Sequence, residues 1–236
     1  MGHLKLPREL KDNKIVWAGF QVFLHDLIYF WDETFFKRDQ EEVVAEFLEF
    51  VAPFCGPNGF NEAHIRALHN QGYLPLKIKA LPEGSRVNIG VPCVTITNTV
   101  DHAYWLPNYL EAWMSCDLWK TPTSATLSHA YRKIIEQYAE LTGGNKDFIT
   151  WQGHDFSVRG MSGIADSAKS GMGHLLSFNG TDNLPAVKLI NDVYGGKLTF
   201  VGGSVPASEH SVMSSTIITE MEKIRQELEA NPSLTL

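Results

Sequence analysis

Cysteine and long apolar runs are scarce in this sequence. Its 236 residues include three cysteines, Cys55, Cys93 and Cys116, an odd number with no CxxC pair and no Cys/His ladder. We therefore expect reduced, mostly buried thiols in a cytoplasmic protein. The longest apolar stretch, IVWAGFQVFL, is too short for the about 20 residues of a membrane helix, and MGHLKLPREL has no signal-peptide core. No membrane partner is expected.

Positive charge and familiar catalytic motifs are scarce as well. The chain has 20 Lys and Arg against 27 Asp and Glu, a net charge of −7. We expect no nucleic-acid partner, although a local basic pocket for a phosphate is still allowed. No Walker loop, GxGxxG, GxSxG or HExxH is present. The apolar fraction of 44% is enough for one sizeable core or two small ones.

Helical spacing of apolar residues dominates the first part of the chain. It predicts a helix over 19–33 and a second over 40–51, with Asp39 as its N-cap and Pro53 and Gly56 at its end. A short helix is expected to follow the capping residue at position 61.

The pattern then changes to strands and back to helices. Residues 74–99 alternate apolar and polar side chains between tight turns, which indicates strands. A helix near Pro107 and a long helix over 121–141 are expected next. The apolar residues expected to face inward on the long helix are Leu127, Tyr131, Ile134, Ile135 and Tyr138.

After residue 145 a short strand, a glycine loop and a helix recur. FITW, HLLSF and LTF are the predicted strands, with helices from about residues 162, 184 and 212, the last to Ala230. Repeated βα units imply parallel strands, so the loops 153–160, 179–183 and 202–211 should converge. We predict an α/β protein: an α+β region over residues 1–120, then βα units over 121–236.

The first loop, HDFSVRG, combines a ring with a guanidinium. Arg159 suits a phosphate or carboxylate, and Phe156 suits a planar, especially cationic, heterocycle. The alternative is a buried phenylalanine and a surface salt bridge. His154 and Asp155 lack a third metal ligand, so structural hydrogen bonds are favoured for them.

The other two loops carry a carboxylate and a histidine. In NGTDN, Asp182 either forms an N-cap or Asx-turn or accepts from an amide or a hydroxyl pair; in a pocket it would select a neutral amide over the matching acid. In GGSVPASEHS, two glycines precede a helix, and His210 either serves as acid, base or nucleophile or faces solvent beside Glu209. The residues alone thus indicate a pocket for a planar ring and a phosphate, without naming a reaction.

Four motifs in this order, LPLKIKALPEG, HDFSVRG, FNGTDN and GGSVPASEHS, resemble the nicotinamide phosphoribosyltransferase family. The resemblance runs from about Gly19 to about Ser215. It implies the conversion of nicotinamide and phosphoribosyl pyrophosphate to nicotinamide mononucleotide and pyrophosphate. It also implies a homodimer with the type II phosphoribosyltransferase fold, a distorted α/β barrel with an added α+β region.

The same resemblance implies roles for individual residues. Phe156 would stack on the pyridine ring, Arg159 would contact the ring and the phosphate side, and Asp182 would accept from the carboxamide. Ser204 and Val205 would line the base pocket. His210 would match the histidine that the family phosphorylates with ATP, and Mg²⁺ would come with phosphoribosyl pyrophosphate. The chain itself is expected to hold no resident metal.

The sequence also departs from the family. It has no Asp-Ser-Tyr-Lys segment, and it stops at ANPSLTL, before the Arg-x-Asp-Ser-Gly stretch that contacts the ribose phosphates. We therefore expect an incomplete barrel: a shortened, split or decayed form that associates with a second copy or a complementing C-terminal chain. A non-catalytic binding or assembly protein and a nicotinate-type relative stay open. A metal hydrolase using His154, Asp155 and His210 is the least favoured alternative.

Overall fold

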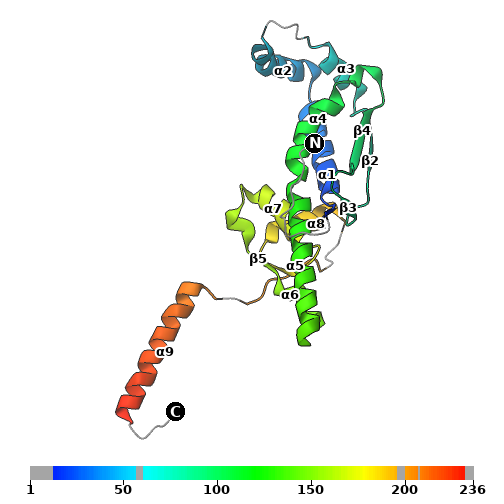
Figure 1. Ribbon diagram of the computed structural model, residues 1–236. Helices are drawn as coiled ribbons and strands as arrows, with labels where there is room; N and C mark the ends of the chain where they lie inside the picture. The colour runs from blue at the N-terminus through cyan, green and yellow to red at the C-terminus, as the bar shows by residue number, and fades with distance from the viewer. Residues whose placement is uncertain (1–12, 57–60, 196–199, 207, 232–236) are drawn as a thin grey trace. The chain divides into compact units, whose positions relative to one another are not determined.

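The computed structural model describes residues 13–56, 61–195, 200–206 and 208–231. Helices and short strands are mixed throughout these residues, in keeping with the predicted combination (Figure 1). The chain divides into two units, residues 1–203 and 204–236, whose positions relative to each other are not determined. The boundary expected near residue 120, between an α+β region and βα units, stays a prediction.

Helices dominate the front part of the first unit, as the apolar spacing predicted. They are α1 Phe20–Trp31, the π-helix η1 Asp32–Phe36, α2 Gln40–Cys55, α3 Ala63–Gln71, the 3₁₀-helix η2 Asp101–Ala103 and α4 Leu106–Leu118. Asp39 caps α2, because its carboxylate accepts the backbone N–H groups of Glu41 and Glu42 at 2.9 and 3.2 Å.

The expected end of the second helix is right for Gly56, which is its C-cap, and wrong for Pro53. Pro53 does not stop α2, which continues to Cys55 before Gly56 turns the chain with a positive φ of 65°. A proline in the last turn removes a single helical hydrogen bond. The carbonyl that loses its partner is that of Glu49, which is exposed, so water can satisfy it.

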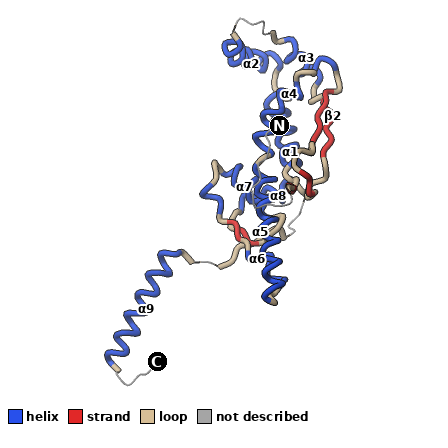
Figure 2. The backbone as a smooth tube through the Cα atoms, in the orientation of Figure 1, coloured by secondary structure: helices blue, strands red, loops and turns tan. Residues whose placement is uncertain are grey.

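The strands of the front part form two antiparallel pairs, which confirms the strand-rich reading of 74–99 (Figure 2). They are β1 Lys14–Val16 with β3 Arg86–Asn88, and β2 Leu76–Ala80 with β4 Val94–Asn98. Ile78 lies opposite Ile96 at the centre of the β2–β4 pair. The N–H of Val16 donates to Thr126 Oγ1 at 2.9 Å. This hydrogen bond ties the β1–β3 pair to α5, Lys120–Thr142, which contains Thr126.

One apolar core holds the front part together. Phe23, Leu68 and Leu106 are each at most 1% exposed within it, and the ring of Trp113 meets Phe23 edge-on at 5.9 Å. Aromatic side chains from α1, η1 and α4 supply much of this core, which fits the large area that such rings bury.

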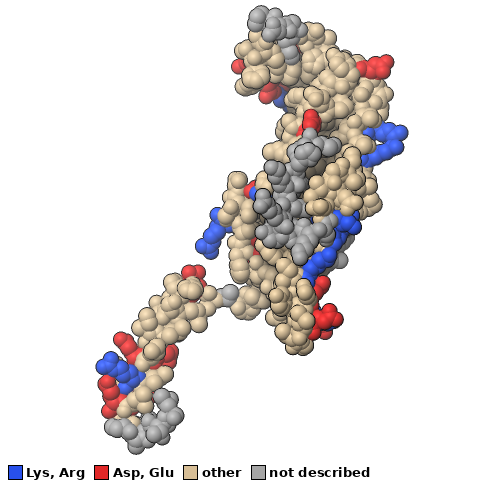
Figure 3. All heavy atoms as spheres, in the orientation of Figure 1, with Lys and Arg blue, Asp and Glu red and all other residues tan. Residues whose placement is uncertain are grey.

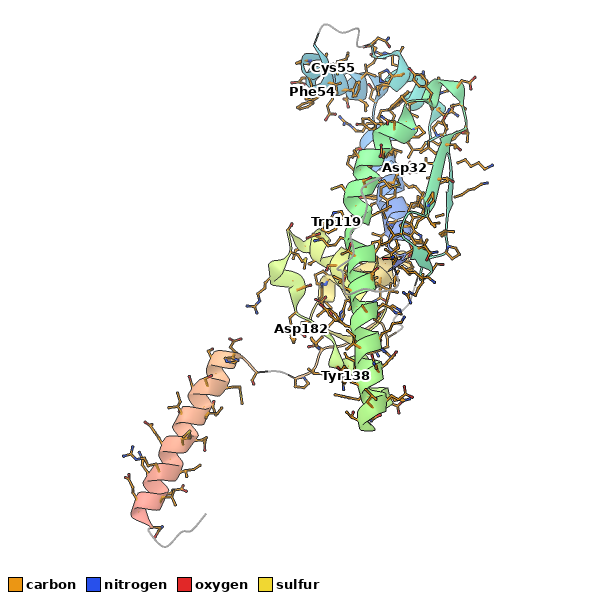
Figure 4. All side chains as sticks on the ribbon, viewed as in Figure 1. Asp32, Phe54, Cys55, Trp119, Tyr138 and Asp182 are labelled. Carbon is orange, nitrogen blue, oxygen red and sulfur yellow. The ribbon has the colours of Figure 1, made fainter. Side chains whose placement is uncertain are left out.

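The second part of the unit is arranged around the long helix α5, Lys120–Thr142. α4 and α5 follow each other end to end and join at Trp119 (Figures 1, 2 and 4). The elements that follow are η3 Lys146–Phe148, α6 Ile149–Gln152, β5 His154–Asp155, η4 Ser157–Gly160, α7 Ile164–His174, β6 Gly180–Thr181 and α8 Leu184–Val193.

The inward face predicted for the long helix is wrong in part. Tyr131, Ile134 and Tyr138 are exposed (Tyr138 is labelled in Figure 4), and Leu127 and Ile135 are only half-buried. The first turns of α5 hold its buried residues, and α7 and β1 pack against this helix. Its second half therefore presents an apolar stripe to the surroundings.

The βα order after residue 145 is confirmed, but two strands lie elsewhere than expected. FITW forms η3 and α6, and HLLSF forms the end of α7 and a turn, while the strands lie at 154–155 and 180–181. Each run supplies one buried side chain, Ile149 or Phe178, each 2% exposed, without forming a strand. The first two residues of LTF, at 198 and 199, lie outside the described residues.

The strands that do form are parallel, as predicted. β5 and β6 pair with His154 opposite Gly180 and Asp155 opposite Thr181. Gly180 makes a further parallel bridge with Gly203, where the N–H of Thr181 donates to the Gly203 carbonyl at 2.9 Å. The chain thus leaves β5 and β6 at the same edge.

The cysteines and the second unit complete the fold. All three thiols are free, but the expected burial is wrong: Cys55 and Cys116 are exposed and Cys93 is half-buried. Among the described residues, no helix is both long and apolar enough to cross a membrane. The second unit contains α9, His210–Ala230, which begins two residues before its expected start.

Candidate functional site

The ends of β5 and β6 bring the first two candidate loops together. Phe156 is the first residue after β5, and Asp182 is the first after β6. The N–H of Asp182 donates to the Asp155 carbonyl at 3.0 Å, so the backbones stay paired as far as the site. The structure therefore confirms the expected convergence for loops 153–160 and 179–183.

His154 contacts both candidate residues. Its Nε2 lies 2.8 Å from Asp182 Oδ1 (Asp182 is labelled in Figure 4), and its ring stacks on Phe156 with centroids 4.3 Å apart. The side chain of His154 is 14% exposed and that of Asp182 40%, whereas Phe156 is 61% exposed. The ring and the carboxylate thus lie at the surface, while the imidazole lies beneath them.

Asp155 and Asn183 form the buried support of this pair. Asp155 accepts from the Ser157 N–H at 2.9 Å and from Asn183 Nδ2 at 3.0 Å, which confirms a structural role for this aspartate. Asn183 is fully buried, and its amide also donates to the Ser167 carbonyl at 2.8 Å. Because such buried polar groups are costly to leave unpaired, this network fixes how both loops leave their strands.

The helix-capping alternative for Asp182 is wrong. The N-cap of α8 is Asn183, whose Oδ1 accepts the Ala186 N–H at 3.2 Å. Asn183 is the functional residue that sequence reasoning missed. A signal was present: Pro185 is favoured in the first turn of a helix, and Asn183 is the capping residue type nearest before it.

Arg159 lies on the turn that follows Phe156. It is exposed on η4, and it pairs with no residue that the structure describes. The turn is held beyond it by Asp166, which accepts the Ser162 N–H at 3.0 Å and lies 3.2 Å from Lys120 Nζ. The Ser162 hydrogen bond, together with Lys120, lowers the pKa of the Asp166 carboxyl. Arg159 can therefore point a guanidinium outward from an anchored turn.

Two glycines let α7 approach its neighbours closely. A Cβ at Gly173 would lie 2.5 Å from the Thr121 carbonyl oxygen of α5. A Cβ at Gly171 would lie 2.7 Å from Ala186 Cβ of α8 and 2.8 Å from Asp155 Oδ2. The glycines of SGMGH thus bring α7 against the buried support of the site.

A second histidine, His174, stabilises the strand β6. His174 Nε2 lies 3.0 Å from the Gly180 carbonyl oxygen, and its ring stacks on Phe178 at 5.2 Å. Burial lowers the pKa of His174, which favours the neutral ring. This histidine holds β6 in place and does not belong to the exposed surface of the site.

The remaining candidate residues belong to the second unit. Ser204 and Val205 open that unit, and His210 is the exposed first residue of α9, after Glu209. The structure does not bring these residues to Phe156 and Asp182, because the two units are not placed relative to each other. In the part of the chain that is described, no group of three His, Cys, Asp or Glu side chains is arranged to hold a metal ion.

Comparisons with known proteins agree with the motifs. A model of the Nicotinate phosphoribosyltransferase (NAPRTase) family matches residues 151–233. "Nicotinamide phosphoribosyltransferase" of Acinetobacter baylyi is 49% identical over 203 residues, 86% of this chain. The chain is homologous to the nicotinamide phosphoribosyltransferases. The proteins of that name from Xanthomonas campestris pv. campestris and Mycoplasma pneumoniae are 35% and 32% identical over 66% and 70% of the chain.

The similarity covers only part of these relatives. The chain spans 40% of the Acinetobacter baylyi protein and 33% of the other two. Among solved structures, human Nicotinic Acid Phosphoribosyltransferase aligns with 86% of this chain and 33% of its own, at 20% identity and a TM-score of 0.48.

Proposed function

We propose that this chain supplies the nicotinamide-binding part of a nicotinamide phosphoribosyltransferase. The reaction joins the pyridine nitrogen to the ribose carbon of phosphoribosyl pyrophosphate and releases pyrophosphate, giving nicotinamide mononucleotide. The observation that carries the proposal is the 49% identity over 86% of the chain to a protein of that name. The four motifs that suggested the family lie within the described residues, apart from residue 207.

The arrangement around His154 supports a pyridine carboxamide as the ligand. Phe156 offers an exposed ring on which a planar heterocycle can stack, and the ring becomes more favourable as the pyridine gains positive charge. Asp182 offers carboxylate oxygens, which accept from the N–H₂ of an amide and repel a carboxylate. Arg159 lies on the adjoining turn, where its guanidinium can bind the phosphate side of the second substrate.

The second unit would complete the base pocket and couple it to ATP. In this proposal Ser204 and Val205 line the pocket, and His210 accepts a phosphoryl group from ATP. His210 is exposed at the start of α9, which leaves its ring accessible to a nucleotide. Mg²⁺ would enter with phosphoribosyl pyrophosphate.

We propose that the chain forms part of a type II phosphoribosyltransferase barrel and associates with a second chain. The parallel pairing of β5, β6 and Gly203 supplies the first strands of such a barrel. The partner would be a second copy or a complementing C-terminal chain. The exposed apolar stripe of α5 supports association. On the face drawn in Figure 3, uncharged residues cover most of the described surface, and basic side chains form no broad patch.

A nicotinate phosphoribosyltransferase is the second candidate, because the matching family model carries that name. The two activities differ in one group of the substrate, an amide or an acid. The carboxylate of Asp182 favours the amide. Asp182→Asn should therefore improve the use of nicotinate relative to nicotinamide if Asp182 is the selector.

The test is direct synthesis of the product. Purified chain is incubated with labelled nicotinamide, phosphoribosyl pyrophosphate, Mg²⁺ and ATP, and nicotinamide mononucleotide is measured. Product that is lost in Arg159→Ala and Asp182→Ala would show that the chain builds a complete site. Without product from folded protein, the assay is repeated with a complementing chain that carries the Arg-x-Asp-Ser-Gly stretch. Continued absence of product would favour a non-catalytic binding or assembly protein.

A further inference from the structure

His154 lies where the stacking ring and the amide-accepting carboxylate meet. Its Nε2 is 2.8 Å from Asp182 Oδ1, and its ring plane lies 27° from that of Phe156. The imidazole therefore contacts both ligand-facing groups and links them.

The backbone leaves His154 little freedom to move. It lies in β5 opposite Gly180, where a Cβ would come within 2.7 Å of His154 Nδ1 and 3.0 Å of the Gly153 carbonyl oxygen. The absent side chain at Gly180 thus makes the space that the imidazole fills. Phe156 follows β5 directly and lies two positions after His154, so the two side chains leave the chain on the same face and their rings can stack.

Asp182 without its neighbour would be a less selective hydrogen-bond acceptor. It follows a strand of two residues and its side chain is 40% exposed, so an isolated carboxylate would sample several rotamers. A hydrogen bond from a largely buried ring selects one of them. A carboxylate offers about four acceptor positions, so Asp182 can be held by His154 and still accept from a carboxamide.

We propose that His154 is a positioning residue that sets the preference for nicotinamide over nicotinate; this inference rests on the proposed function. The imidazole donates from Nε2 to Asp182 and keeps the carboxylate beside the ring that stacks on Phe156. A pyridine on Phe156 then presents its substituent to a fixed carboxylate oxygen. An amide N–H donates to that oxygen, whereas an acid meets a like charge.

The experiment measures binding of nicotinamide and of nicotinate to the full chain by titration calorimetry. His154→Leu removes the donor at similar volume, and His154→Gln keeps an N–H donor without the ring. His25→Leu is the matched control, because His25 is an exposed histidine on α1, outside this cluster. Circular dichroism and melting curves show that each variant is folded.

We expect His154→Leu to weaken nicotinamide binding roughly tenfold, the loss expected from a hydrogen bond to a charged group, and to leave nicotinate binding unchanged or stronger. His154→Gln should restore most of the preference. In an Asp182→Asn background, His154→Leu should change the ratio of the two dissociation constants by less than about twofold, because the coupling partner is absent.

The outcomes separate this inference from the proposed function. If the unchanged chain binds nicotinamide and His154→Leu leaves the preference intact, the inference is wrong and the proposed function stands. An equal loss for both ligands, not restored by His154→Gln, would assign His154 a purely structural role and also overturn the inference. If the unchanged chain binds neither nicotinamide nor nicotinate, the proposed nicotinamide-binding function fails, and the inference fails with it.

Discussion

Gly171 offers the sharpest test of how the site is supported. A Cβ added there would lie 2.7 Å from Ala186 Cβ, 2.8 Å from Asp155 Oδ2 and closer still to Asn183 Nδ2. None of these atoms belongs to a flexible side chain with space to move: Ala186 and Asn183 are fully buried, and Asp155 is 7% exposed. Gly171→Ala must therefore push α7 away from α8 or break the Asp155–Asn183 hydrogen bond.

The expected magnitude follows from opposing effects. Alanine is favoured over glycine inside a helix by about 1 kcal/mol. Overpacking a buried contact costs about 1–3 kcal/mol, and disturbing buried hydrogen bonds costs about 1–3 kcal/mol more. We expect Gly171→Ala to lower the free energy of unfolding by about 1–5 kcal/mol.

Urea unfolding followed by tryptophan fluorescence measures this change. Gly160→Ala is the matched control, because Gly160 lies on the neighbouring η4 with nothing within 4 Å of an added Cβ. It should change the free energy of unfolding by less than about 0.5 kcal/mol. A Gly171→Ala chain as stable as the parent would refute the packing argument for α7.

Three further predictions concern other parts of the first unit. Asn183→Ala removes the α8 cap and two buried hydrogen bonds, so it should lower the free energy of unfolding, measured by urea denaturation, by about 2–4 kcal/mol. The control Asn145→Ala removes an exposed cap and should cost at most about 1 kcal/mol. Burial and the hydrogen bond to Glu83 raise the pKa of Tyr194. The unfolded chain therefore releases this proton at lower pH than the folded chain, and the free energy of unfolding should fall above about pH 10. Tyr194→Phe should flatten that fall in denaturation curves taken from about pH 8 to 11. Ile134→Lys on the exposed stripe of α5 should reduce association in sedimentation velocity with little change in unfolding midpoint, and an unchanged sedimentation coefficient would argue against this stripe as a contact.

Helices were predictable from the sequence because their signals are local. Asp39 caps α2 as expected, and Pro107 lies in the first turn of α4. The strands after residue 145 were misplaced because a run of apolar residues does not fix the backbone conformation: Phe178 is buried at the end of a turn, while the strand begins at Gly180. Two-residue parallel strands carry no alternation that a sequence pattern could show.

The site was predictable only in part, for a similar reason. The parallel order of the βα units brought Phe156 and Asp182 to one edge as expected. The bond between His154 and Asp182 was not foreseen, because it depends on Gly180 standing opposite His154. The capping residue was misassigned by one position, from Asn183 to Asp182, since both residue types favour helix N-termini.

The shortness of β5 and β6 has a consequence for the order of folding. Their pairing joins residues that are 26 positions apart in the chain, His154 with Gly180, through very few backbone hydrogen bonds. Closing such a loop costs entropy that two residue pairs cannot offset alone. We therefore expect β5 and β6 to pair only after α5, α7 and α8 have packed. The chain would then acquire its ring-binding surface late in folding and lose it early in unfolding.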